Sequence, residues 1–307
     1  MTGVPAVRPF AIALAVVTAS LGLTACIGTG GPPVDCTTAG LPTTVAYKTV
    51  PGTAANLTSL DIHAPAGACA APVLMWVHGG GYRTGDKKNQ MDDKVRLFNG
   101  RGWIVVSVNY RLTVATDPAT ARFPDHYDDV ADAIAWVHRT IGDYGGDPAR
   151  IAVLGHSAGA DIVSNVVTNP AYLQRQGLPL STVRCAGPLD TEGFDKVAAG
   201  TDDPDGEQDQ WQVALGNNPD YRTQTSATTL VRPGIGIPEM IGVFRGTLRR
   251  QQIETAFLDA VRAAGIAATT IDARSLTHGE VNSRIGASGD TVMTTPLVWF
   301  LTRCFAR

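Results

Sequence analysis

Ile151-Ala-Val-Leu-Gly-His-Ser-Ala-Gly159 is the stretch that decides the fold. Its first four residues form a short apolar run, which is typical of a buried strand. The run from Ala158 to Asn169 has the pattern of a helix, so Ser157 stands on the turn between strand and helix. Gly155 and Gly159 flank this serine, because such a sharp turn leaves no room for a Cβ atom. The stretch therefore predicts a serine hydroxyl exposed at the end of a central strand.

A second glycine motif, His78-Gly79-Gly80-Gly81, follows the apolar run Val73-Leu-Met-Trp-Val77. Glycines after a strand let backbone N–H groups approach a developing oxyanion closely. We therefore expect an oxyanion hole formed by the N–H groups of Gly80, Gly81 and Ala158. His78 is expected to shape the loop.

Apolar strand patterns alternate with helical patterns along most of the chain. The expected strands are 45–50, 57–63, 73–77, 103–108, 151–154, 183–189, 240–244 and 268–271, and the expected helices are 126–141, 158–169, 247–264 and 296–305. This alternation predicts an α/β fold with a mostly parallel, doubly wound sheet of about eight strands. The first two strands are expected to be antiparallel.

The stretch 191–236 interrupts this rhythm between the sixth and seventh predicted strands, and is a possible cap over the site. Its acidic run, 201–210, lacks the spacing of a calcium-binding loop, so a solvated loop is expected there.

In these motifs, and in Asn109-Tyr-Arg-Leu112 and Asp143-Tyr-Gly-Gly-Asp-Pro148, the chain resembles the α/β-hydrolase superfamily. The resemblance is most specific to the HGGG-type carboxylesterases, in the branch of hormone-sensitive-lipase-like, feruloyl-esterase-like and arylformamidase-like proteins. It covers roughly residues 45–305. It implies an α/β-hydrolase fold and acyl transfer without a cofactor, in which Ser157 attacks the ester and a histidine carries the proton.

In this superfamily the histidine comes last in the chain, and His278 follows the last predicted strand. Related esterases place the acid of the triad in a G-x-x-D turn, which here reads Gly246-Thr-Leu-Arg249 and lacks it. Asp190, at the end of the sixth predicted strand, is the favoured acid. The alternatives are Glu254, Asp259, Glu280 and a dyad without an acid.

Three arginines, Arg245, Arg249 and Arg250, gather near that same turn. They indicate either recognition of a carboxylate-bearing substrate or simply a solvated helix start.

The N-terminal residues 1–25 have the pattern of a signal peptide. The apolar stretch 10–23 is too short for a comfortable membrane span and ends in Leu23-Thr-Ala-Cys26, which resembles a bacterial lipobox. We expect lipidation of Cys26, a tether over 26–44, the hydrolase domain over 45–307, and an exported lipoprotein on the extracytoplasmic face of the cell membrane. An ordinary secretory signal is the alternative.

Four further cysteines remain, and an even number in an exported protein suggests two disulfides. The favoured pairing is Cys36–Cys69 and Cys185–Cys304, and the alternative is free buried thiols. The histidines are scattered and no C-x-x-C occurs, so no metal site is expected.

A hydrophobic content of 44% and a charged content of 17% indicate a globular protein, and the net charge of −3 argues against nucleic acid as a partner. The sequence thus predicts a serine carboxylesterase acting on short or medium acyl or aryl esters. The alternatives are a serine amidase or arylformamidase, or a non-catalytic binding lipoprotein on a hydrolase scaffold.

Overall fold

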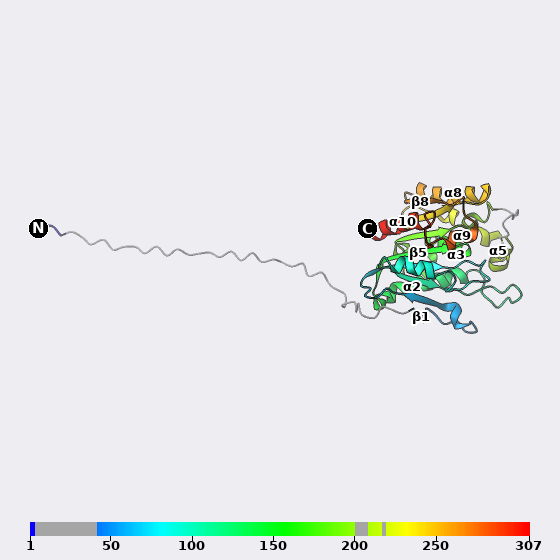
Figure 1. The fold of residues 1–307 in the computed structure, drawn as a ribbon, viewed down its shortest axis with the longest axis horizontal. Helices are drawn as coiled ribbons and strands as arrows, with labels where there is room; N and C mark the ends of the chain where they lie inside the picture. The colour runs from blue at the N-terminus through cyan, green and yellow to red at the C-terminus, as the bar shows by residue number, and fades with distance from the viewer. Residues whose placement is uncertain (4–41, 200–207, 217–218) are drawn as a thin grey trace. The chain divides into compact units, whose positions relative to one another are not determined.

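The computed structural model describes residues 1–3, 42–199, 208–216 and 219–307 (Figure 1). The chain divides into two units, Met1–Pro33 and Val34–Arg307, and the second unit contains every described helix and strand. The predicted signal peptide from residue 4 on, Cys26, and the tether up to residue 41 lie outside the described residues.

A single eight-stranded sheet forms the centre of the second unit, with the strand order β1-β2-β4-β3-β5-β6-β7-β8. The strands are β1 (Thr43–Ala46), β2 (Ser59–His63), β3 (Ala71–Val77), β4 (Ile104–Val108), β5 (Gly146–His156), β6 (Cys185–Leu189), β7 (Glu239–Phe244) and β8 (Ala268–Asp272). β1 pairs with β2, and β2 with β4, in antiparallel fashion, whereas all other pairs are parallel. The predicted mostly parallel sheet is confirmed.

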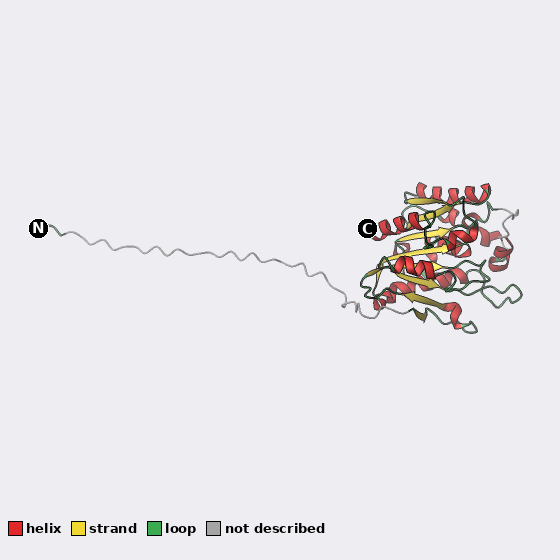
Figure 2. Cartoon of the chain, viewed as in Figure 1, coloured by secondary structure: helices red, strands yellow, loops and turns green. Residues whose placement is uncertain are grey.

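Helices lie on both sides of this sheet (Figure 2). They are α1 (Asp92–Asn99), α2 (Asp125–Thr140), α3 (Ala158–Thr168), α4 (Pro170–Gln174), α5 (Gln208–Leu215), α6 (Pro219–Gln224), α7 (Ala227–Leu230), α8 (Leu248–Ala263), α9 (His278–Ser283) and α10 (Thr294–Phe305). Short 3-10 turns occupy Ala55–Thr58, Ile141–Tyr144, Leu180–Thr182 and Gly193–Asp195.

Two hydrophobic cores follow from the alternation of side chains along the central strands. In β3, Met75 belongs to the core beneath α2, α3 and α8, whereas its neighbours Leu74 and Trp76 belong to the core beneath α1 and α10. Successive residues of a strand point to opposite faces, so a strand covered on both faces must be apolar throughout.

Some boundaries differ from the sequence prediction. β1 ends at Ala46 instead of continuing to residue 50, because its partner Ser59 is the first residue of β2 and the preceding Ala55–Thr58 form a 3-10 turn. β5 begins at Gly146 instead of Ile151, because Gly146 already pairs with Ala71 of β3. The sequence does not predict α1, α4 or α9, nor the three helices α5, α6 and α7.

The insertion between β6 and β7 contributes α5, α6 and α7 in its described part. Most of its acidic run lies outside the described residues.

The predicted disulfide Cys185–Cys304 is present and joins β6 to α10. Cys69 is also disulfide-bonded, and its predicted partner, Cys36, lies outside the described residues. Within the described part of the chain, no helix is both long and apolar enough to cross a membrane.

Candidate active site

Ser157 occupies the turn between β5 and α3 in a strained backbone conformation, with φ +57° and ψ −125°. Its own N–H donates to the carbonyl of Leu189 at 3.1 Å, which fixes the turn against the end of β6. A Cβ atom at Gly155 would lie 2.4 Å from the carbonyl oxygen of Gly159, and one at Gly159 would lie 2.3 Å from that of Val77. The structure therefore requires both glycines, as the sequence pattern predicts.

The loop after β3 also adopts conformations that favour glycine, with φ +116° at Gly80 and +58° at Gly81. The N–H groups of Gly80, Gly81 and Ala158 donate no hydrogen bond within the described part of the chain. Ala158 starts α3, where the first N–H groups have no partner inside the helix. All three predicted donors therefore remain available to a ligand.

His78, expected to shape this loop, is its first residue. Its ring stacks on Tyr110 with centroids 4.5 Å apart, and Tyr110 donates its hydroxyl to the His78 carbonyl at 3.0 Å. Burial lowers the pKa of His78, so the ring is neutral. Its contacts place the glycines that follow.

His278 begins α9, directly after the N-cap Thr277. Its Nδ1 lies 2.6 Å from Oδ2 of Asp190, and its side chain is 39% exposed. Asp190 follows β6, is fully buried and has φ +67°. The structure thus brings together the histidine and the favoured acid, 88 residues apart in sequence.

Two arginines hold the Asp190 carboxylate from the other side. Arg245 donates Nε to Oδ2 at 2.5 Å, and Arg250 donates Nε to Oδ1 at 2.7 Å and Nη2 to the Asp190 carbonyl at 3.0 Å. Burial alone would raise the pKa of Asp190, but the His278 hydrogen bond and the charges of Arg250 and Arg245 hold it well below its usual range. Asp190 is therefore ionised at neutral pH.

The other predicted acids do not reach the His278 imidazole. Glu254 is buried in α8, and burial followed by the charge of Asp190 raises its pKa well above the usual range. Asp259 is 62% exposed and pairs with Arg262. Glu280 completes the capping box of α9 with Thr277.

Both interpretations of the arginine cluster are wrong. Arg245 and Arg250 bind Asp190, and Arg249, which replaces the acid of the G-x-x-D turn, binds Glu192 at 2.8 Å. The cluster is neither a solvated helix start nor free to bind substrate, because it compensates two buried carboxylates.

The sequence does not predict that His156, the residue before the serine, contacts His278. Its ring packs on that of His278 with centroids 4.5 Å apart, and its Nε2 donates to the His278 carbonyl at 2.8 Å. Burial, followed by the nearby charge of His278, lowers the pKa of His156 to about 3, so it stays neutral. Its position inside G-x-S-x-G was the only signal that could have pointed to it.

The nearest ligating atoms of His156, Asp190 and His278 lie within 4.8 Å of one another, which is close enough for a metal ion. Both Asp190 carboxylate oxygens already accept from an arginine, however, and two cations beside the site disfavour a third. Within the described residues, this group therefore fits a hydrogen-bonded relay better than a metal centre.

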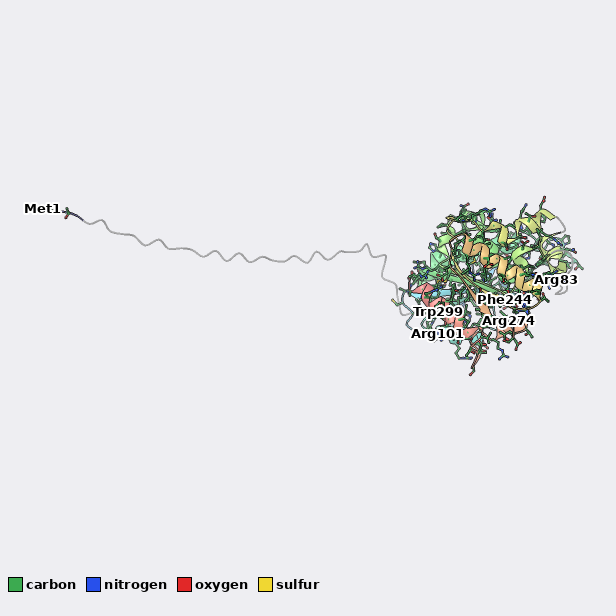
Figure 3. The ribbon with its side chains drawn as sticks, turned by 90° about the horizontal axis from the view of Figure 1, so that it is seen from above. Met1, Arg83, Arg101, Phe244, Arg274 and Trp299 are labelled. Atoms are coloured by element: carbon green, nitrogen blue, oxygen red, sulfur yellow. A yellow bond between two sulfur atoms is a disulfide. The ribbon has the colours of Figure 1, made fainter. Side chains whose placement is uncertain are left out.

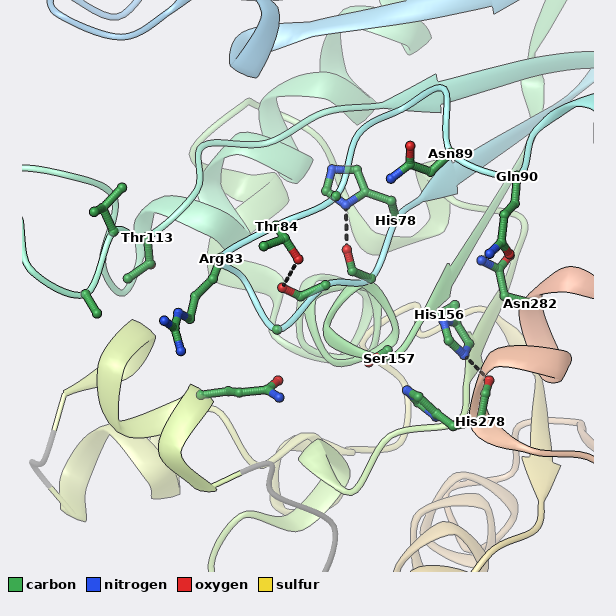
Figure 4. A pocket seen from close by; sticks show the side chains of 17 residues that line it. His78, Arg83, Thr84, Asn89, Gln90, Thr113, His156, Ser157, His278 and Asn282 are labelled. Atoms are coloured by element: carbon green, nitrogen blue, oxygen red, sulfur yellow. Dashed lines mark hydrogen bonds between the residues drawn. The ribbon is translucent and has the colours of Figure 1, made fainter.

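A cavity of about 850 Å³ opens in front of these residues (Figure 4). Gly80, Gly81, Ser157 and His278 line it, and Gln210 of α5 brings the insertion to its wall. A Cβ at Gly81 would lie 2.3 Å from Oε1 of Gln210, so the insertion packs directly on the glycine loop 78–81 (the oxyanion loop).

A buried ion pair fastens the insertion beneath the site. Lys196 donates Nζ to Oδ1 of Asp161 in α3 at 2.6 Å, and both side chains are fully buried. Tyr127 of α2 donates its hydroxyl to Oδ2 of Asp161 at 3.0 Å, and Tyr82, directly after the glycine loop, donates to the same oxygen. One carboxylate thus joins the oxyanion loop, α2, α3 and the insertion.

The sheet order, the serine turn after β5 and the histidine after β8 define an α/β-hydrolase fold. The sequence model of the Carboxylesterase family matches residues 33–177. Among solved structures, the chain resembles a truncated carbohydrate esterase from gut microbiota (TM-score 0.69, 20% identity, 90% of this chain and 99% of that chain). It also resembles an esterase from Pyrobaculum calidifontis (TM-score 0.65, 18% identity, 81% of each chain).

Curated relatives match over part of the chain. The chain is 40% identical over 100 residues to the probable carboxylic ester hydrolase LipM of Mycobacterium tuberculosis, which is 33% of this chain and 22% of LipM. It is 34% identical over 154 residues to the fumonisin B1 esterase of Sphingopyxis macrogoltabida, which is 43% of this chain and 28% of that protein. The chain thus spans less than a third of the length of either relative.

Proposed function

We propose that this protein is a serine carboxylesterase that hydrolyses short or medium acyl or aryl esters through an acyl-enzyme. The observation that carries the proposal is the 2.6 Å contact between His278 Nδ1 and Asp190 Oδ2, at a cavity that Ser157 also lines. The esterases among its relatives support the same chemistry.

In the proposed reaction, Ser157 Oγ attacks the ester carbonyl carbon while His278 Nε2 takes the hydroxyl proton. The N–H groups of Gly80, Gly81 and Ala158 stabilise the resulting oxyanion, and one such donor is typically worth about 3 kcal/mol of barrier. The tetrahedral intermediate then collapses to the acyl-enzyme, and His278 returns the proton to the leaving alcohol. A water molecule, activated by His278, then attacks the acyl-enzyme carbonyl. The carboxylic acid is released and the Ser157 hydroxyl is restored.

Asp190 keeps the His278 proton on Nδ1, so that Nε2 is free to accept from the serine. The Ser157 hydroxyl makes no hydrogen bond to any described residue. In unliganded hydrolases the bond between nucleophile and base is often long and tightens when substrate binds. The proposal requires this contact to form in the ester complex.

The test is hydrolysis of 4-nitrophenyl acetate and butyrate by the full chain and by Ser157→Ala. We expect turnover by the wild type, no turnover by the variant, and labelling of Ser157 by a fluorophosphonate. Preferential hydrolysis of matched anilides or N-formyl substrates would instead favour the amidase or arylformamidase alternative. Equal inertness of both proteins, together with an unlabelled Ser157, would favour the binding lipoprotein.

We also propose export and lipid anchoring through Cys26, on the strength of the lipobox-like Leu23-Thr-Ala-Cys26. Metabolic labelling with a fatty acid should mark the wild type and not Cys26→Ser. Equal labelling of the two proteins, or none, would contradict the anchor.

A further inference from the structure

The cavity contains an arginine that the proposed chemistry does not use. Arg83 follows the glycine loop and Tyr82, and its N–H donates to the Gly80 carbonyl at 3.1 Å, which ties its backbone to the oxyanion loop. Its exposed side chain lines the cavity and makes no hydrogen bond or ion pair to a described residue. In Figure 4, Arg83 and His278 lie on opposite sides of Ser157.

The other described residues of the cavity wall bring no negative charge to compensate Arg83. Among the described residues that line it, none is an aspartate or glutamate, and Arg83 alone carries a permanent charge. The polar side chains around it are mainly amides and hydroxyls, from Thr84, Asn89, Gln90, Thr113, Gln210 and Asn282. Such groups bind oxygen atoms without bringing a negative charge.

We propose that Arg83 recognises a carboxylate on the ester, so that the preferred substrates are anionic. This inference rests on the proposed esterase function and names its substrate class. A guanidinium offers a planar fork of donors that matches a carboxylate in bidentate geometry. Because the Arg83 backbone is held by the oxyanion loop, a bound carboxylate would also fix the distance from the anionic group to the scissile carbonyl.

This position differs from the three arginines singled out in the sequence. Arg245, Arg249 and Arg250 are engaged with buried carboxylates, whereas Arg83 faces the cavity. Figure 3 labels Arg83 and a comparable exposed arginine, Arg101, at different sides of the folded unit. Arg101 does not line the cavity, so Arg101→Gln removes the same charge elsewhere and serves as the matched control.

The experiment compares anionic and neutral esters of similar size in two pairs. In the first pair the charge lies on the alcohol side, with 4-acetoxybenzoate against 4-acetoxybenzamide. In the second it lies on the acyl side, with mono-4-nitrophenyl adipate against 4-nitrophenyl hexanoate. The readout is the ratio of kcat/KM for the anionic ester to that for the neutral one, in wild type, Arg83→Gln, Arg83→Lys and Arg101→Gln.

We expect Arg83→Gln to lower this ratio by about fivefold in at least one pair, as for a solvent-accessible ion pair of good geometry. Arg83→Lys should retain part of the preference, Arg101→Gln should leave the ratio unchanged, and the affected pair identifies the side of the ester that carries the charge. An unchanged ratio in both pairs, or an equal loss on neutral and anionic esters, would overturn the proposal.

A binding measurement separates this proposal from the esterase function. Calorimetric titration of Ser157→Ala with 4-acetoxybenzoate and with mono-4-nitrophenyl adipate should, for at least one of them, give a Kd about fivefold lower than titration of Ser157→Ala/Arg83→Gln. If the wild type hydrolyses none of the esters but this difference persists, the esterase function fails while Arg83 remains an anion-binding residue. If the Kd values of the two proteins agree for both anionic esters, the anion site itself is wrong.

Discussion

Replacing Asp190 by asparagine should damage catalysis and stability through two separable contacts. Both carboxylate oxygens accept from an arginine: Oδ1 from Arg250, and Oδ2 from Arg245 as well as from His278. An amide has one oxygen and one NH₂ group, so either orientation directs the NH₂ group at an arginine donor. If it takes the place of Oδ2, it also forces Nδ1 of His278 to accept and moves the proton to Nε2.

That tautomer cannot accept the proton of the serine, so kcat should fall about 10³- to 10⁴-fold while hydrolysis above background persists from the oxyanion hole. Arg250 is 2% exposed and would lose its buried counter-charge. Breaking a buried ion pair from one side destabilises by about 3 to 5 kcal/mol, which corresponds to a fall in Tm of about 10 °C for a domain of this size.

The assay is 4-nitrophenyl butyrate hydrolysis together with thermal unfolding, with kcat measured at least 15 °C below the variant's own Tm. Asp259→Asn is the matched control, because Asp259 is 62% exposed and pairs with Arg262 on the surface. A kcat within tenfold of the wild type would refute the reasoning, and the same assay on Glu254→Gln would then be the next test.

Three further perturbations follow from the buried contacts. Burial lowers the pKa of His126 to about 4, so between about pH 6.5 and 4 only the unfolded chain binds a proton at this residue. The free energy of unfolding should therefore decrease as the pH is lowered through this range, by at most about 1.4 kcal/mol per pH unit, and less steeply in His126→Gln. Replacing Cys185 and Cys304 by alanine opens a loop of 119 residues and should destabilise by about 2 to 4 kcal/mol, measured by urea unfolding. Lys196→Met removes the cation that pairs with the buried Asp161 and should lower the free energy of unfolding by about 3 kcal/mol. The double variant Lys196→Met/Asp161→Asn should recover much of this lost stability.

Each of these has a result that would count against it. Identical pH slopes in wild type and His126→Gln would mean that another group carries the acid sensitivity. An unchanged urea midpoint in the double-alanine variant, or in reduced wild type, would show that the cross-link contributes nothing. A double variant less stable than Lys196→Met alone would show that Asp161 does not depend on Lys196 for its charge balance.

Local patterns in the sequence predicted the central sheet well. The run Ile151-Ala-Val-Leu154 and its glycine-flanked serine are constrained by neighbours in the chain, and the structure repeats that strand, turn and helix. Elements governed by pairing elsewhere were less accurate. β5 extends back to Gly146 because of its partner β3, which no local periodicity reveals.

The surroundings of the candidate site could not be predicted, because they depend on contacts between distant residues. Arg245 and Arg250 lie 55 and 60 residues from Asp190, and their helical neighbourhood resembles any solvated helix start. Likewise, the ring contact between His156 and His278 spans 122 residues. The sequence showed the residue types that acyl transfer needs, and the fold determined which of them meet.

The contacts of the Asp161 carboxylate restrict which segments of this fold can be exchanged in chimeric proteins. Asp161 lies on α3, the helix directly after Ser157, and accepts hydrogen bonds from Lys196 of the insertion and Tyr82 after the glycine loop. A chimera that received residues 191–236 from this chain without an aspartate at the matching place on α3 would acquire a buried lysine beneath Ser157 whose charge the chimera does not neutralise. The insertion should therefore be exchanged only together with the helix that carries Asp161. Crossover points in shuffled libraries should lie before α3 or after β7, and not at residues 191 and 236.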